Sequence, residues 1–261
     1  MQKAQILFET GAATHVGKVR ERNEDSYLVR PEAGIWAVAD GMGGHEAGDL
    51  ASRTVVDALA SIEAPTSASE LLSLCKSRIF DANSQLVKIS HERGGVTIGT
   101  TVTILLTFDG YFACVWSGDS RMYRVRDNSI SQISRDHTEA EDLLADGIIT
   151  PEEAKSWVGK NVITRAIGVG DPPELEVVTG AIRSDDVFII CTDGLTRHVH
   201  DDEILESAAA LTAEQACDRL ILLTLERGAG DNVTVVVVRY KPEHSSASDL
   251  QAVPSGLRGR S

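Results

Sequence analysis

Two hairpin signals in the middle of the chain constrain its fold more than any other feature. The β-branched run 101–108 and the run 111–117 flank Asp109-Gly110, which is a favoured two-residue turn. A second hairpin is centred on Asp127-Asn128. Strands that are joined by such short turns are antiparallel, so the sequence argues against a doubly wound parallel sheet.

Helical periodicity occurs in two pairs of segments, one before and one after these hairpins. The pairs cover about 47–62 and 68–93, and then about 201–209 and 212–227. Capping boxes open two of the helices, at Ser67/Glu70 and at Thr212/Gln215. Further strands are predicted at 175–181, 187–191 and 233–240. This order favours an α+β fold, a four-layer α-β-β-α sandwich of two antiparallel sheets flanked by helix pairs.

Residues 136–168 interrupt the strands with two short polar helices, and Thr150-Pro151 begins the second. We interpret this segment as a small flap subdomain, with a plain connecting excursion as the alternative. One domain is predicted over 1–240. The segment 241–261 has little apolar content, so we expect a disordered tail.

The composition bounds the class of protein. The chain has 261 residues, of which 42% are hydrophobic, and this suits a globular core. No apolar segment reaches the roughly 18 residues of a membrane span, and the apolar stretch near Met1 is too short for a signal peptide. These features favour a cytoplasmic protein.

The formal net charge of −14 makes nucleic acid and anionic membrane surfaces poor partners. Bound cations could offset part of this charge, although ordinary solubility explains it equally well. The four cysteines are far apart and form no CxxC pair, so we expect buried, reduced thiols.

Acidic side chains recur beside glycine at the predicted strand ends. The apolar run 35–39 leads into Asp40-Gly41, a pattern that alone usually means a turn. Three other aspartates have a glycine neighbour in this way: Asp119, Asp193 and Asp231. Glu24 and Asp25 join the set if a hairpin places them beside Asp40.

Clustered carboxylates repel one another unless cations lie between them. An all-oxygen donor set selects hard ions such as Mg²⁺ or Mn²⁺ over Zn²⁺. A water held between two such ions becomes a nucleophile near neutral pH, which suits hydrolysis of phosphate esters. Arg20 could bind the phosphate oxygens, or it could form a surface ion pair with Glu21 or Glu24.

Seven sequence blocks support the phosphate chemistry. They are RERNEDSY, VADGMGGHEAG, GTTVTILL, WSGDSRMYRVRD, NVITRAIG, IICTDGL and AGDNVTVVVV. The blocks resemble, in the same order, those of the PPM family of metal-dependent protein phosphatases, also called PP2C-type, in its bacterial branch. The resemblance runs from about Val16 to Tyr240 and implies the same α-β-β-α sandwich.

The resemblance also implies roles for individual residues. Asp40 resembles the carboxylate that bridges two metal ions, and Asp25 resembles the residue that holds their waters. Arg20 matches the phosphate-binding arginine. The remaining matches are metal ligands: Asp193 and Asp231 for the first ion, Glu24 and the Gly41 carbonyl for the second, and Asp119 for a third ion shared with Asp193.

One position departs from a common family pattern. Eukaryotic members often carry a histidine, proposed as general acid, where this chain has Met42, and methionine cannot donate a proton. His45 is a nearby alternative that could instead cap the following helix. We expect His137 to be structural or part of the flap.

The resemblance implies a Mg²⁺- or Mn²⁺-dependent phosphatase for phosphoserine and phosphothreonine in proteins. Its implied partners are a cognate Ser/Thr kinase and that kinase's substrates, and the N-terminal part resembles phosphatases that accompany type VI secretion kinases. We expect a monomer. The alternatives are a pseudophosphatase that only binds phosphoproteins, and a hydrolase of small phosphoesters.

Overall fold

The computed structural model describes residues 7–43 and 47–241. His45 and segment 242–261, which makes up all but the first residue of the predicted tail, lie outside the described residues. Among the helices that are described, none is both long and apolar enough to cross a membrane.

Two sheets make up the centre of the molecule, and all of their strand pairs are antiparallel. The first has the order β1 (Leu7–His15), β11 (Val233–Lys241), β10 (Val187–Cys191), β7 (Arg121–Arg126), β8 (Ser129–Gln132). The second has the order β2 (Asp25–Arg30), β3 (Ile35–Gly43), β5 (Val102–Phe108), β6 (Tyr111–Ser117), β9 (Glu176–Ala181), and β4 (Ile98–Thr100) pairs with the end of β3.

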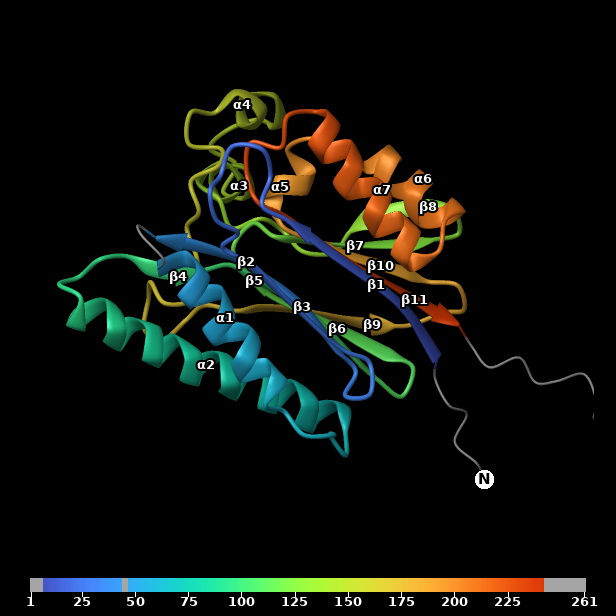
Figure 1. Cartoon of the computed structure of the whole chain (residues 1–261), viewed down its shortest axis with the longest axis horizontal. Coiled ribbons are helices and arrows are strands. Elements are labelled where there is room, and N and C mark those ends of the chain that lie inside the picture. Colours follow the sequence, from blue (N-terminus) through green and yellow to red (C-terminus); the bar gives the residue numbers. More distant parts are fainter. Residues whose placement is uncertain (1–6, 44–46, 242–261) are drawn as a thin grey trace, which may run out of the picture.

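Helices cover the outer face of each sheet, as Figure 1 shows. Helices α1 (Ala47–Ala60) and α2 (Ala68–Glu92) pack on the second sheet. Helices α5 (Asp193–Thr196), α6 (Asp201–Ala210) and α7 (Ala213–Glu226) lie on the side of the first. The predicted four-layer sandwich is therefore confirmed.

Strand β3 shows how the sequence builds these layers, because alternate side chains of a strand point to opposite faces. Ile35 and Ala37 pack with the apolar residues of α1 and α2. Trp36 and Val38 point the other way, into the apolar core that lies between the two sheets. A strand buried on both faces reads as a continuous apolar run, which is the pattern seen before Asp40.

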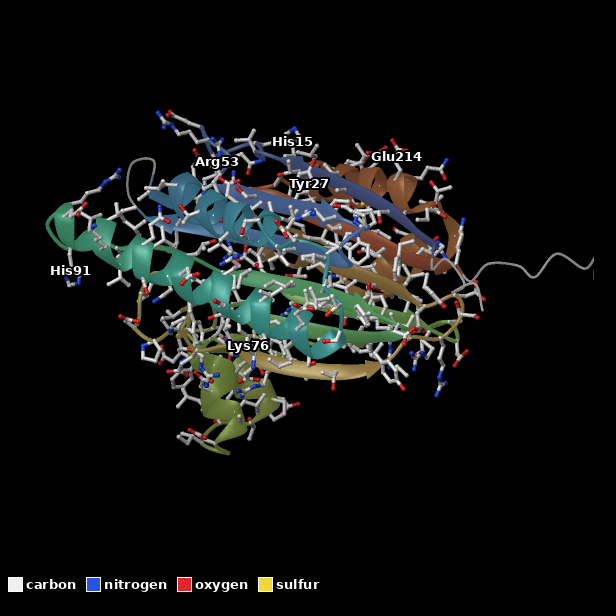
Figure 2. All side chains as sticks on the ribbon, turned by 90° about the horizontal axis from the view of Figure 1, so that it is seen from below. His15, Tyr27, Arg53, Lys76, His91 and Glu214 are labelled. Atoms are coloured by element: carbon white, nitrogen blue, oxygen red, sulfur yellow. The ribbon has the colours of Figure 1, made fainter. Side chains whose placement is uncertain are left out.

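The flap is a small unit with its own core. Helices α3 (Glu139–Ala145) and α4 (Pro151–Ser156) enclose Ala140, Ile149 and Ala154. In Figure 2 these olive-green helices project from the body of the sandwich. The two predicted short helices are present in this segment.

Several details differ from the sequence expectation. Strand β3 does not end at Asp40 but continues to Gly43, because β4 pairs with its last residues. Lys241 completes β11 and so belongs to the sheet, not to a tail. Ser67 caps α2 as predicted, but Glu70 accepts its hydrogen bond from the Thr66 N–H, 2.7 Å away, instead of from Ser67.

Candidate active site

The predicted acidic residues meet at one edge of the sandwich because the strand registers align their ends. Asp25 opens β2 directly opposite Asp40 on β3. Asp193 follows β10, whose Cys191 pairs with Arg121, two residues after Asp119. Asp231 precedes β11 and pairs with arginines that are described below. Five aspartates from five separate segments therefore share one site.

Asp25 bridges the two sheets. Its Oδ2 accepts hydrogen bonds from the hydroxyls of Thr234, at 2.7 Å, and Thr192, at 3.0 Å, which both belong to the side of the first sheet. Its Oδ1 is buried and has no hydrogen-bond partner in the part of the chain that the structure describes. Burial raises the pKa of the Asp25 carboxyl to about 7, although the two hydroxyls oppose the shift.

Asp40 is held through its backbone. Its N–H donates to the Thr101 hydroxyl at 3.0 Å, and its carbonyl accepts from the Thr101 N–H at 2.9 Å. Burial raises the pKa of Asp40 well above its usual value, and the neighbouring charge of Asp25 adds to the shift. Burial also raises the pKa of Asp193, against the opposing charge of Arg197.

Asp119 sits in a turn that only glycine can precede. Gly118 has a φ of +109°, and a Cβ there would lie 2.6 Å from Thr101. The Ser120 hydroxyl contacts the Thr101 hydroxyl at 2.7 Å, which ties this turn to Asp40. Asp119 is buried, and burial raises its pKa to about 7.

Glu24 and Gly41 form an oxygen-lined cradle beside α1. The Glu24 N–H donates to the side chain of Asn232 at 2.8 Å. A Cβ at Gly48 would lie 2.8 Å from both Glu24 Oε1 and the Gly41 carbonyl oxygen. The missing side chain of Gly48 thus leaves the space between these two oxygens open.

Two arginines pair with these carboxylates. Arg20 contacts both oxygens of Asp231, at 2.9 and 3.0 Å, so its pairing is with Asp231 and not with Glu21 or Glu24. Arg197 contacts Asp231 at 3.0 Å and also forms an ion pair with Asp193. Among the described residues, no three His, Cys, Asp or Glu side chains are grouped closely enough to hold an ion as they stand.

The residues nevertheless fit hard divalent cations. Within the described residues, three buried carboxylate oxygens have no hydrogen-bond partner, one each on Asp25, Asp119 and Asp193. Burial raises the pKa of the same three carboxyls and neighbouring carboxylates add to the shift, so a bound cation would stabilise their charged forms. All of the candidate ligand atoms are oxygen, the type that Mg²⁺ and Mn²⁺ prefer.

Sequence reasoning missed Arg197 and the residues that support Asp25 and Glu24. Arg197 directly follows the short helix α5 and is four residues after Asp193, a spacing that is also common in ordinary ion pairs on helix surfaces. Thr192 and Asn232 are the sequence neighbours of predicted ligands, and this was the one feature of the sequence that could have pointed to them. His137 is fully buried, and its Nδ1 accepts from the Gly118 N–H at 3.1 Å, which agrees with a structural position.

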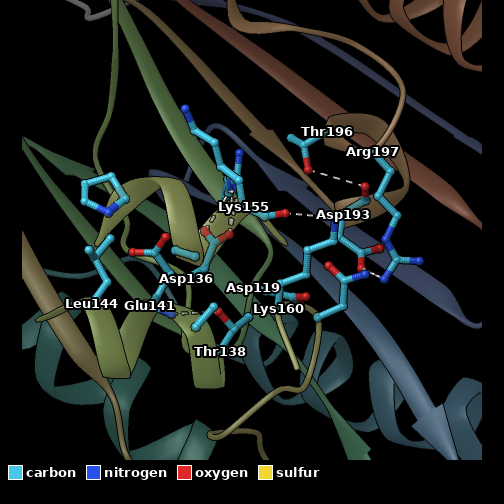
Figure 3. A pocket seen from close by; sticks show the side chains of 15 residues that line it. Asp119, Asp136, Thr138, Glu141, Leu144, Lys155, Lys160, Asp193, Thr196 and Arg197 are labelled. Carbon is cyan, nitrogen blue, oxygen red and sulfur yellow. Dashed lines mark hydrogen bonds and ion pairs between the residues drawn. The ribbon is translucent and has the colours of Figure 1, made fainter. Parts of the chain in front are cut away.

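A cavity of about 550 Å³ separates this carboxylate cluster from the flap (Figure 3). Asp119, Asp193 and Arg197 line one side of it, and residues of α3, α4 and the segment after α4 line the other. A volume of this size, about 300–1,000 Å³, is typical of pockets that bind small ligands or substrate side chains.

Comparison with known proteins identifies the family. A family model described as Protein phosphatase 2C matches residues 14–220. The chain therefore belongs to the protein phosphatase 2C family, as the sequence blocks predicted.

Individual relatives agree. The serine/threonine protein phosphatase PstP of Mycobacterium tuberculosis is 37% identical over 238 residues, which are 91% of this chain and 46% of PstP. This chain thus spans about half the length of that curated relative.

Two solved structures are also similar. PppA, described as a key regulatory component of the type VI secretion system in Pseudomonas aeruginosa, has a TM-score of 0.82 at 36% identity, covering 89% of this chain and 97% of that one. The catalytic domain of PstP in complex with two manganese ions has a TM-score of 0.81 at 35% identity, covering 91% and 100%.

Proposed function

We propose that this protein is a Mn²⁺- or Mg²⁺-dependent phosphatase that hydrolyses phosphoserine and phosphothreonine in proteins. The observation that carries the proposal is the convergence of buried aspartates whose free oxygens and raised pKa values call for cations. Family membership and the two manganese ions of the PstP structure support the same reading.

In this proposal Asp40, Asp193 and Asp231 hold the principal ions together with Glu24 and the Gly41 carbonyl. Asp119 and Asp193 hold a third. Bound ions of this kind lower the pKa of water and neutralise charge on a phosphoryl group.

The protein's own groups have distinct tasks in the proposed reaction. Asp25 would hold water at the ions by accepting its hydrogen bonds through the oxygen that Thr192 and Thr234 leave free. Arg20, whose side chain is 53% exposed, binds the phosphate oxygens of the substrate with its planar guanidinium. Met42 lies on β3 and has no proton to donate, so leaving-group protonation falls to another group.

We further propose a Ser/Thr kinase and its substrates as partners, and a role in type VI secretion. The similarity to PppA, a regulatory component of that system, supports the second of these. The monomeric state and the cytoplasmic location that were expected from the sequence stay predictions.

The first test is phosphate release from a phosphothreonine peptide with Mn²⁺, with Mg²⁺ and with EDTA. We expect metal-dependent turnover that falls by at least about 100-fold in Asp193→Ala, because a principal ion loses its ligand. Asp218→Ala, an exposed aspartate on α7, is the matched control and should keep full activity. Peptide binding without turnover under every metal condition would instead identify a pseudophosphatase, and turnover of small phosphoesters alone would exclude protein substrates.

A further inference from the structure

The cavity between the metal-site carboxylates and the flap extends beyond the space of one phosphate group. Its inner wall carries Asp119 and Asp193, which the proposed function assigns to ions. Its outer wall is formed by the flap, including Lys155 on α4 and Lys160 just after it. A substrate chain that presents its phosphate to the ions therefore places neighbouring side chains against these two lysines.

The charges that line the cavity leave a positive surplus on the flap side. Arg121 is committed to Asp136 through a bidentate contact, at 2.7 to 3.0 Å, so this pair is internally neutral. In the proposed function, bound metal ions would neutralise the negative charges of Asp119 and Asp193. Of the remaining flap residues, Glu141 carries one negative charge against the two lysines.

Both lysines are available for binding. Within 7–43 and 47–241, neither has a carboxylate within ion-pair distance, and the one hydrogen bond of the Lys160 side chain goes to the carbonyl of Lys155 at 3.4 Å. Both side chains are exposed. Lysines elsewhere on the surface, such as Lys88 and Lys241, do have carboxylate partners.

The flap holds the backbone that carries the lysines with local contacts that need no substrate. The Thr150 hydroxyl and the Glu153 carboxylate cap α4 reciprocally. The Trp157 indole donates to Glu139 at 3.2 Å, which ties the end of α4 to the start of α3. Because this backbone is already ordered, only the lysine side chains need to be ordered on binding.

We propose that Lys155 and Lys160 form an anion-binding subsite that recognises a second negative group on the substrate, beside the phosphate that is hydrolysed. This inference rests on the proposed phosphatase function and specifies its substrate class. The recognised group is either a second phosphate or the carboxylate of an acidic residue, since both present anionic oxygens to ammonium groups.

The test uses the full chain with Mn²⁺ and three phosphothreonine peptides that differ only near the phosphothreonine. One peptide has neutral neighbours, one has glutamates, and one has a second phosphorylated residue. We expect the wild type to show a KM roughly 3- to 10-fold lower for the anionic peptides, a preference that shrinks at high salt. Comparing the two anionic peptides tells whether carboxylate or phosphate is preferred.

Substitutions assign that preference to the flap lysines. In Lys155→Ala/Lys160→Ala the ratio of KM values between neutral and anionic peptides should fall to about one, while Lys155→Arg/Lys160→Arg should keep it. Lys88→Ala/Lys241→Ala changes the net charge equally at distant sites and should also keep it.

The outcomes separate the two proposals. Equal KM values for all three peptides in the wild type, or a preference that survives in Lys155→Ala/Lys160→Ala, would overturn the subsite and leave the phosphatase function standing. Failure to hydrolyse any of the peptides would refute the phosphatase function itself.

Discussion

At the scale of single residues, the site is a cluster of carboxylates whose negative charge is partly neutralised by neighbouring arginines. Arg197 supplies part of that balance through its ion pairs with Asp193 and Asp231. Since both aspartates are proposed ligands, the guanidinium and a metal ion compete for the same oxygens. We therefore expect Arg197 to weaken the binding of an ion at this site.

Replacing Arg197 with alanine should strengthen metal binding. Removal of the competing cation leaves Asp193 and Asp231 with less compensation, so we expect the Kd for Mn²⁺ to fall roughly 3- to 10-fold. Isothermal titration calorimetry measures this directly. Arg197→Lys should give an intermediate Kd, and an unchanged or weaker affinity in Arg197→Ala would contradict the competition.

At the scale of elements, the flap is joined to the sandwich through His137. Its imidazole lies against Trp116, with ring centroids 5.9 Å apart, and its Nε2 is 3.2 Å from the Glu176 carboxylate on β9. Burial lowers the pKa of His137, so the neutral ring that accepts from Gly118 is favoured. One side chain thus links the flap, the β6–β7 turn that carries Asp119, and the edge strand.

His137→Phe should loosen this junction. The ring can still contact Trp116, but the Gly118 N–H loses its acceptor inside the protein, at a cost of about 1–3 kcal/mol in unfolding free energy. Urea unfolding measures the loss, and hydrogen exchange should quicken at the flap amides. His91→Phe, at the exposed end of α2, is the control and should change neither quantity.

At the scale of the whole molecule, the carboxylate cluster makes stability depend on both pH and metal. The folded-state pKa values of Asp25 and Asp119, about 7, lie above the ordinary aspartate value of 3.8. Folding therefore favours the protonated forms. The stabilisation that the two protonated carboxyls give to the folded state is complete below pH 4 and is lost as the pH rises through 7.

In EDTA, the unfolding free energy should therefore fall between about pH 4 and pH 7 and level off above this range, by a few kcal/mol in order of magnitude. Mn²⁺ should reverse the trend, because deprotonated ligands bind the ion better. Urea unfolding at several pH values, once with EDTA and once with Mn²⁺, gives the slope of the unfolding free energy against pH under each condition. An EDTA slope that is flat, or that keeps its size in Asp25→Asn/Asp119→Asn, would show that these carboxyls do not determine the pH dependence.

The sequence predicted those parts of the fold that depend on local signals. Asp109-Gly110 specifies a hairpin by its own conformational preference, and Ser67 marks the start of α2. Strand β1 was not predicted, because it is defined by pairing with β11 at the other end of the chain. The separation of β4 from β5 at Thr101 depends on the hydrogen bonds of Thr101 to Asp40, which no local pattern encodes.

The residues of the site likewise divide into those that the sequence predicts and those that only the fold reveals. The aspartates beside glycine could be read from the sequence because their residue type and spacing carry the chemistry. Their partners could not: Thr234 reaches Asp25 across 209 positions of the chain. Arg197 resembled an ordinary helix-surface cation until the fold placed Asp231 beside it.

The position of Asp25 has a consequence for how such a protein can evolve. Asp25 belongs to one sheet and its two hydroxyl donors lie with the other, so neither half of the sandwich contains a complete site. A lineage can vary the parts of its outer helices and flap that lie away from the site, and the chemistry survives as long as the two sheets keep their mutual alignment and Gly48 and Asp193 keep their places. The feature that selection must hold constant is the interface between the two sheets, whereas the surfaces that face other proteins are free to diversify.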